Sequence, residues 1–216
     1  MGYTAPPDVQ RAVAQDVDLW ERFTTKATAL GATVQRAGGP AEAAGLLARE
    51  AGPALAVTAG LAEQLPHLVQ ALGAPGRHAG KDEHQRGDDG DTPAAQGGPI
   101  ATEVAAAGRF AVAETGSVAV WESAADRGAC FLADRLWLLV PGESIVPTLD
   151  DAMARLATQV RGGSRYLTLM SGPSRTADIE RTLTIGVHGP RRLAIVIVDP
   201  PAGAGSGGNS AEREGA

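Results

Sequence analysis

The chain has 216 residues, of which 44% are hydrophobic, and this is enough to bury the core of one compact α/β domain. Its 19 basic and 25 acidic residues give a net charge of -6. No cluster of lysine and arginine is dense enough to follow a phosphate backbone, so nucleic acid is not an expected partner. No window approaches the roughly 18 consecutive apolar residues of a membrane span, and we expect a cytoplasmic protein.

The single cysteine, Cys130, can form no internal disulfide. It also falls short of the set of thiolates that holds an iron–sulfur cluster. Any such cofactor would therefore have to be carried by another chain, and we expect neither a cofactor nor a metal site in this one.

The first 72 residues show an alternation of helical and extended patterns. Apolar residues three and four positions apart predict a long helix that begins after Asp8, its expected cap, and ends near Gly31. The elements predicted next are a strand at 32–35, a helix over 41–50, a strand at 54–58 and a helix over 61–72. Such alternation is typical of βαβ units, so we expect a mostly parallel sheet.

Two segments are unsuited to a packed core. Residues 73–99 are rich in glycine, proline and charge, with alanine as their only apolar residue, and predict a mobile surface loop. Residues 200–216 are of low complexity and predict a disordered tail. We therefore expect a single domain over 1–199, with the 73–99 loop inside it.

The second half of the chain predicts further alternation. A helix is expected near Thr102, leading into a strand at F-A-V-A, and T-G-S-V-A-V-W reads as a strand that could run antiparallel to it. Thr148 is positioned to cap a helix that begins with Leu149. The remaining predicted strands are L-W-L-L-V at 136–140, Y-L-T-L-M at 166–170 and the continuous apolar segment 193–198, which is typical of a strand covered by helices on both faces.

The first candidate site is A-E-T-G at 113–116, where a predicted strand ends. Gly116 lets the backbone turn sharply or approach a ligand closely. Glu114 could then act as a general base, a nucleophile or an acceptor for a ligand hydroxyl. The alternative is a structural turn in which Glu114 pairs with an arginine or caps a helix, and the sequence leaves both open.

The second candidate site is S-G-P-S-R-T-A-D-I-E at 171–180. The backbone N–H groups and hydroxyls of Ser171, Gly172 and Ser174 could converge on a carboxylate or phosphate, and Arg175 could add a bidentate contact. The simpler interpretation is an ordinary turn in which Ser174 caps the next helix. Asp178 and Glu180 are two residues apart, so they face different directions and are poor partners for a shared proton.

The third candidate site is G-V-H-G-P at 186–190, in which glycines flank His188. A histidine in an open loop is suited to proton transfer near neutral pH, although a structural histidine is the commoner outcome. No P-loop, dinucleotide-binding or α/β-hydrolase motif is present.

Together with I-V-P-T at 145–148, the A-E-T-G-S, S-G-P-S-R-T-A-D-I-E and G-V-H-G-P segments resemble, in order and spacing, the lactate-utilisation protein C family, whose domain is called LUD. The resemblance is strong over about residues 100–199. Ser117 stands where the family tends to have threonine, which keeps the hydroxyl. The family motif falls on Glu114, Thr115, Gly116, Ser171, Gly172, Ser174, Thr176, Asp178, Glu180, His188 and Gly189.

The resemblance implies a three-layer α/β sandwich of the NagB/RpiA/CoA-transferase type. It also implies a part in converting L-lactate to pyruvate beside cysteine-rich iron–sulfur partner proteins that carry the clusters. Two other functions stay open: a stand-alone enzyme of acyl or phosphoryl chemistry, and a regulatory protein that binds a carboxylate.

We expect Glu114, His188 and Asp178 to be the catalytic candidates. Thr115, Gly116, Ser171, Gly172, Ser174, Thr176, Glu180 and Gly189 are expected to bind a ligand, a small carboxylate being possible. Because each candidate lies where an apolar segment gives way to a glycine-containing turn, Glu114, Ser171, Ser174, Asp178 and His188 are predicted to meet in one pocket at the carboxyl ends of the strands.

Overall fold

The computed structural model describes residues 7–73, 102–159, 166–176, 184–185 and 189–201. The predicted mobile loop from residue 74 and the predicted tail from residue 202 lie outside these ranges. The first half contains α1 (Pro7–Ala29), β1 (Thr33–Ala37), α2 (Pro40–Glu50), β2 (Ala56–Val57), α3 (Ala59–Gln64) and α4 (Pro66–Ala71). The second half contains β3 (Glu103–Val112), β4 (Ser117–Glu122), α5 (Ala124–Leu132), β5 (Arg135–Pro141), β6 (Ile145–Val146), α6 (Leu149–Gln159), β7 (Tyr166–Met170), β8 (Arg175–Thr176), β9 (Thr184–Ile185) and β10 (Arg192–Val198).

The main sheet has the strand order β1-β10-β5-β3-β4-β7, and β2 and β6 pair with β3 as well. Its pairings are parallel except for β3 with β4 and β4 with β7, which are antiparallel. The expected mostly parallel sheet is therefore confirmed, together with the antiparallel pairing of β3 and β4. The two-residue strands β8 and β9 form a separate antiparallel pair.

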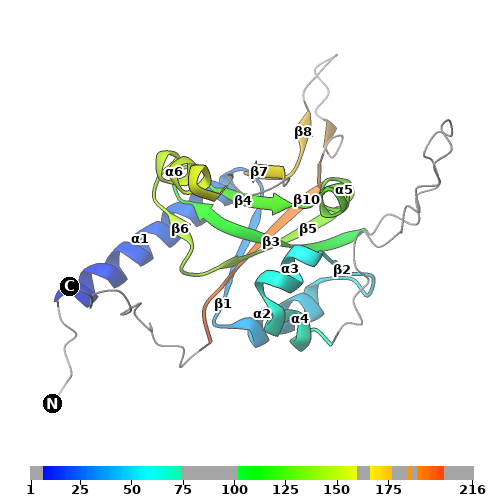
Figure 1. Ribbon diagram of the computed structural model, residues 1–216, viewed down its shortest axis with the longest axis horizontal. Coiled ribbons are helices and arrows are strands. Elements are labelled where there is room, and N and C mark those ends of the chain that lie inside the picture. The colour runs from blue at the N-terminus through cyan, green and yellow to red at the C-terminus, as the bar shows by residue number, and fades with distance from the viewer. Residues whose placement is uncertain (1–6, 74–101, 160–165, 177–183, 186–188, 202–216) are drawn as a thin grey trace, which may run out of the picture.

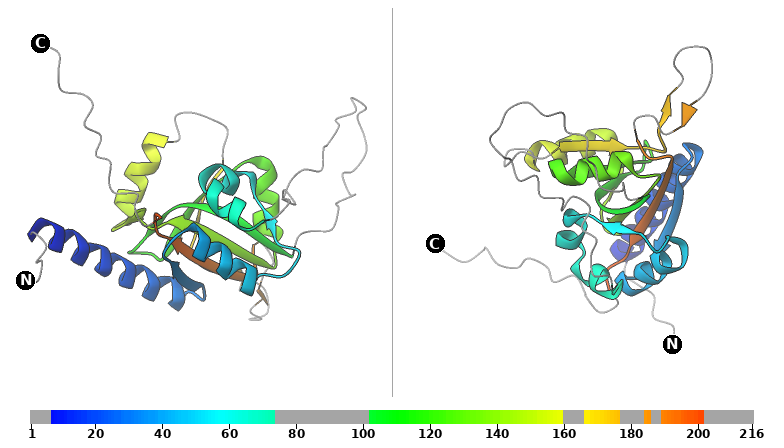
Figure 2. Two further views of the ribbon diagram at one scale, coloured as in Figure 1. Left: turned by 90° about the horizontal axis from the view of Figure 1, so that it is seen from below. Right: turned by 90° about the vertical axis from the view of Figure 1, so that its right-hand side faces the viewer.

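Helices cover both faces of the sheet, which confirms the predicted three-layer α/β sandwich (Figure 1). On one face, Phe23 and Ala27 of α1 and Cys130 of α5 pack in one core with side chains of the central strands. On the other face, α2, α3 and α4 contribute Leu47, Leu61 and Leu68 to a second core, and α6 contributes Ala152 and Leu156 to a third. The N-terminal part of α1 extends beyond the edge of the sheet (Figure 2).

A β-bulge in β3 determines which side chains share a face. The register of β3 against β4 shifts between Gly108 and Phe110, so Arg109 is an extra residue on this strand. Ala107 packs in the α2–α4 core, and Phe110 packs in the α6 core on the same face although it is three residues later. The bulge therefore places Arg109 next to the boundary between these two cores.

The structure corrects several sequence predictions. The helix predicted over 61–72 is two helices, because Pro66 begins a new helix after Leu65. The helix predicted near Thr102 is wrong: β3 occupies that segment. Its alanines fit as small side chains in a central strand, and their burial outweighs their helix propensity.

Helix α5 was not predicted, although Ser123 caps it by accepting a hydrogen bond from the Asp126 N–H at 3.1 Å. The short strands β6, β8 and β9 were not predicted either. Among the helices that the structure describes, none combines the length and the apolar character that crossing a membrane requires.

Candidate functional site

Glu114 caps helix α6. It follows β3, and its Oε2 accepts a hydrogen bond from the N–H of Leu149, the first residue of α6, at 2.7 Å. The Thr148 hydroxyl accepts from the Asp151 N–H at 3.1 Å, so two side chains satisfy donors of this helix start. A carboxylate at this position also interacts favourably with the positive end of the helix dipole. The structural alternative for Glu114 thus has a geometric basis, and the chemical role stays a prediction.

Glu114 is also exposed at the wall of a shallow cavity of about 460 Å³. The other lining residues are Ala113 and a row on α1, namely Asp18, Glu21, Arg22, Thr25 and Lys26. Two cations and two further carboxylates therefore face the same space as Glu114. Ser171, Gly172 and Ser174 do not line it.

Replacing Glu114 with alanine should lower the free energy of unfolding by about 1 kcal/mol, the usual contribution of a charged cap. Glu114→Gln keeps an oxygen acceptor and should lose less. Urea unfolding of the two variants measures both effects. If Glu114→Gln keeps its stability but abolishes the activity of the protein, the carboxylate has a chemical role in addition to capping α6.

Ser171 is hydrogen-bonded to Ser117, at the end of the turn that contains Glu114. The last residues of β7 pair with the first residues of β4, Met170 opposite Val118, and the Ser117 and Ser171 hydroxyl oxygens are 2.6 Å apart. In the same turn, the Thr115 hydroxyl accepts a hydrogen bond from the Ser117 N–H at 3.3 Å. The A-E-T-G-S and S-G-P-S segments therefore meet through two serine hydroxyls.

Two glycines of these segments allow close contact with the end of α1. A Cβ on Gly116, whose φ is +67°, would lie 2.5 Å from the Ala27 nitrogen. A Cβ on Gly172 would lie 2.7 Å from the Leu30 carbonyl oxygen. Gly116 is explained by packing against the backbone of the last turn of α1, and Gly172 by packing against the backbone of the connection that follows it.

The end of the third candidate site, Gly189 and Pro190, also contacts the S-G-P-S segment at 171–174, which we call the serine turn. The Ser174 N–H donates to the Pro190 carbonyl at 2.9 Å, and a Cβ on Gly189 would lie 3.2 Å from the Ser174 Cβ. Gly189 and Pro190 come before β10, so this contact lies at the amino end of a parallel strand.

Thr176 is described only through its backbone in β8, and Asp178, Glu180 and His188 lie outside the described residues. The meeting of all the candidates in one pocket stays a prediction.

A buried carboxylate beside α5, that of Glu122, was missed in the sequence analysis. Glu122 is 1% exposed, and no described donor meets either carboxylate oxygen with hydrogen-bond geometry. The Arg127 guanidinium is 3.5 Å from Oε2. Burial raises the pKa of Glu122, and the neighbouring Cys130 thiol and Arg127 oppose the rise only in part. Burial likewise raises the pKa of the Cys130 thiol far above its usual range.

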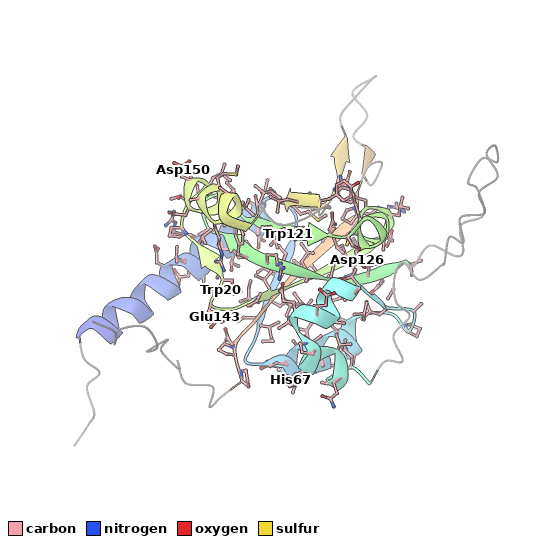
Figure 3. The ribbon with its side chains drawn as sticks, viewed as in Figure 1. Trp20, His67, Trp121, Asp126, Glu143 and Asp150 are labelled. Carbon is pink, nitrogen blue, oxygen red and sulfur yellow. The ribbon has the colours of Figure 1, made fainter. Side chains whose placement is uncertain are left out.

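A cleft between α3 and α6 was also missed. It is a cavity of about 380 Å³ lined by Gln64, Arg109, Phe110, Trp121, Pro141 and Arg155, and it adjoins a second cavity of about 240 Å³ that shares Gln64, Arg109 and Trp121. Figure 3 labels Trp121 over β4, between α6 and α3. The available signal was one arginine inside the apolar segment A-A-A-G-R-F-A-V, because a charge in a central strand needs a structural or functional reason.

The protein is an α/β sandwich, and in it the A-E-T-G-S and S-G-P-S turns meet beside the first helix. The chain belongs to the LUD domain family, whose family model matches residues 20–198.

Similar proteins include "Lactate utilization protein C 1" of Bacillus mycoides, 37% identical over 92 residues, which are 41% of this chain and 39% of that protein. "Lactate utilization protein C" of Deinococcus radiodurans is 40% identical over 91 residues, 41% of this chain and 42% of that protein. The chain thus aligns with less than half the length of these relatives.

The crystal structure of a DUF162 family protein from Deinococcus radiodurans superposes with a TM-score of 0.58 and 23% sequence identity. The superposition covers 85% of this chain and 98% of the other. This similarity supports the fold described above.

Proposed function

We propose that this chain takes part in L-lactate utilisation, as a subunit that supports the oxidation of L-lactate to pyruvate beside iron–sulfur partner proteins. The observation that carries the proposal is its membership in the LUD family, together with relatives named lactate utilization protein C.

The cysteine content supports the part of the proposal that concerns the clusters. Cys130 is the one cysteine of the sequence, and its side chain is fully buried in the core between α5 and the sheet. Burial keeps the thiol protonated at neutral pH, whereas a cluster ligand must be a thiolate. The two electrons removed from lactate would therefore pass to clusters on the partner proteins.

The contribution of this chain would be binding and positioning. The serine turn offers hydroxyls and backbone N–H groups, and the cavity beside Glu114 offers two cations and three carboxylates. Such groups hold and orient a small hydroxy acid without themselves accepting electrons. A small carboxylate is the ligand class that this proposal requires.

The proposal is tested by lactate-dependent reduction of an electron-accepting dye. The purified full chain alone should reduce no dye, and activity should appear when cysteine-rich iron–sulfur partner proteins are added. His188→Ala and Glu114→Ala should lower the activity of the assembled system. Steady turnover by the isolated chain would overturn the subunit proposal and favour a stand-alone enzyme.

A further inference from the structure

In the cleft between α3 and α6, a hydrogen bond to Gln64 holds the Arg109 side chain in place. The Arg109 Nη1 donates to the Gln64 Oε1 at 3.1 Å, and the Gln64 Nε2 donates to the Gly108 carbonyl at 2.7 Å. This carbonyl belongs to the residue at which the register of the bulge shifts. The Gln64 side chain therefore satisfies the Gly108 carbonyl at the bulge and also holds the Arg109 guanidinium in place. The other N–H donors of Arg109 are left for a further acceptor.

Aromatic rings hold both guanidinium groups of the cleft. The guanidinium carbon of Arg109 lies 5.5 Å from the centre of the Trp121 ring, and that of Arg155 lies 5.1 Å from the centre of the Phe110 ring. These distances are typical of cation–π contacts. Such contacts restrict the movement of both guanidinium groups, which favours the binding of a planar oxyanion.

The charged side chains that line the larger cavity are arginines. Among its described lining residues are two arginines and no carboxylate, and Glu63 is the acidic residue that lines the adjoining smaller cavity. The indole N–H of Trp121 is buried and has no acceptor among the described residues. Two guanidinium groups on one cavity wall are an arrangement that suits an anionic ligand.

The remaining walls of the cleft are apolar. Phe110, Pro141 and Trp121 line it, and its volume of about 380 Å³ lies in the range of small-molecule sites. A ligand that matches these walls has a negatively charged end and a flat or apolar part.

We propose that this cleft binds a small organic acid, with its carboxylate on Arg109 and Arg155 and its apolar part against Trp121. Bidentate contact with a guanidinium suits a carboxylate, and the aromatic wall favours a carbon-containing anion over a bare inorganic ion. The inference rests on this geometry and not on the proposed role in lactate utilisation. Gln64 is a positioning residue in this site, because it acts through Arg109.

The test is calorimetric titration of the full chain with pyruvate, phenylpyruvate and inorganic phosphate. Both organic acids should bind, the aryl acid more tightly, and phosphate should bind more weakly than either. Arg109→Ala and Arg155→Ala should each weaken binding about tenfold or more, as expected for lost charge-assisted hydrogen bonds. Trp121→Phe should reduce the preference for the aryl acid.

Arg49→Ala is the matched control, because it removes one positive charge from an exposed position in the last turn of α2 that lines neither this cleft nor the Glu114 cavity. It should bind as the unmodified chain does. Weaker binding in Arg22→Ala but not in Arg109→Ala would move the acid to the Glu114 cavity and overturn the inference. Binding of phosphate alone would overturn the organic-acid assignment.

Arg155 is exposed on α6, so Arg155→Ala keeps the test informative even if Arg109→Ala does not fold. If no organic acid binds, the inference fails while lactate-dependent activity with the partner proteins can still be observed. The two proposals can therefore fail separately.

Discussion

Replacing Gly116 with alanine should lower the free energy of unfolding by about 3 to 5 kcal/mol, enough to unfold a marginally stable domain. Two effects add at this position. The φ of +67° is unfavourable for any residue with a Cβ, and the new Cβ would lie 2.5 Å from the Ala27 nitrogen and 2.7 Å from the Lys26 carbonyl carbon. Both are backbone atoms of α1, so the last turn of that helix would have to move.

The burial at the end of α1 explains why this movement is unfavourable. Phe23 and Ala27 are fully buried in the core that α1 shares with the sheet, so displacing the helix exposes apolar surface.

Gly73→Ala is the matched control for Gly116→Ala. Gly73 also has a positive φ, +60°, but no atom lies within 4 Å of where its Cβ would be. It should cost only the backbone strain, about 1 kcal/mol. Urea unfolding of both variants separates strain from contact, and equal losses would mean that α1 is not packed tightly against the A-E-T-G turn.

Patterns that depend on local sequence predicted the fold well. The long first helix, the Thr148 cap and the apolar strand before Asp199 are each determined by neighbouring residues, and the structure has all three. The first helix begins at Pro7, however, so Asp8, its predicted cap, lies inside it. Segment 102–113 failed for the opposite reason. Its alanines favour a helix locally, but their small size is used where β3 lies in the centre of the sheet, and such tertiary packing is not visible from local pattern.

The candidate site was predictable as segments and not as contacts. Glycines and hydroxyls marked the A-E-T-G-S and S-G-P-S turns, and these do meet at Ser117 and Ser171. The bond from Glu114 to the start of α6 was foreseen only as one of two alternatives. The Arg109 cleft depends on a one-residue bulge in β3, and a register shift of this kind is decided by the partner strand.

Glu122 was missed because nothing local shows that an acid at the end of a strand will be covered. Its burial results from α5, whose Phe131, together with Tyr166 on β7, places Arg127 over two rings, 4.7 and 4.9 Å from their centres. The helix thereby encloses the carboxylate and leaves its ion-pair partner half-exposed. A helix and a neighbouring strand together create the environment that changes the pKa.

Replacing Glu122 with glutamine should stabilise the protein at neutral and alkaline pH by about 1 to 2 kcal/mol, because it removes a buried charge whose desolvation Cys130 and Arg127 offset only in part. Burial holds the pKa of Glu122 above its ordinary value of 4.5. Below that value the carboxyl is protonated in both states and contributes nothing. As the pH rises above 4.5, the unfolded chain ionises first, so stability is lost until the pH passes the folded-state pKa and is constant afterwards.

Denaturant unfolding of the original chain and of Glu122→Gln, measured from pH 4 to pH 8, should therefore give curves that nearly coincide at pH 4 and separate as the pH rises. Glu143→Gln is the control, since Glu143 is exposed on the turn after β5 and its replacement removes the same charge without altering a buried position. Arg127 should tolerate the loss of its partner, because its side chain is 40% exposed and stacks on Phe131 and Tyr166. A Glu122→Gln variant that is less stable at pH 8 would show that the attraction between Glu122 and Arg127 exceeds the desolvation of the carboxylate.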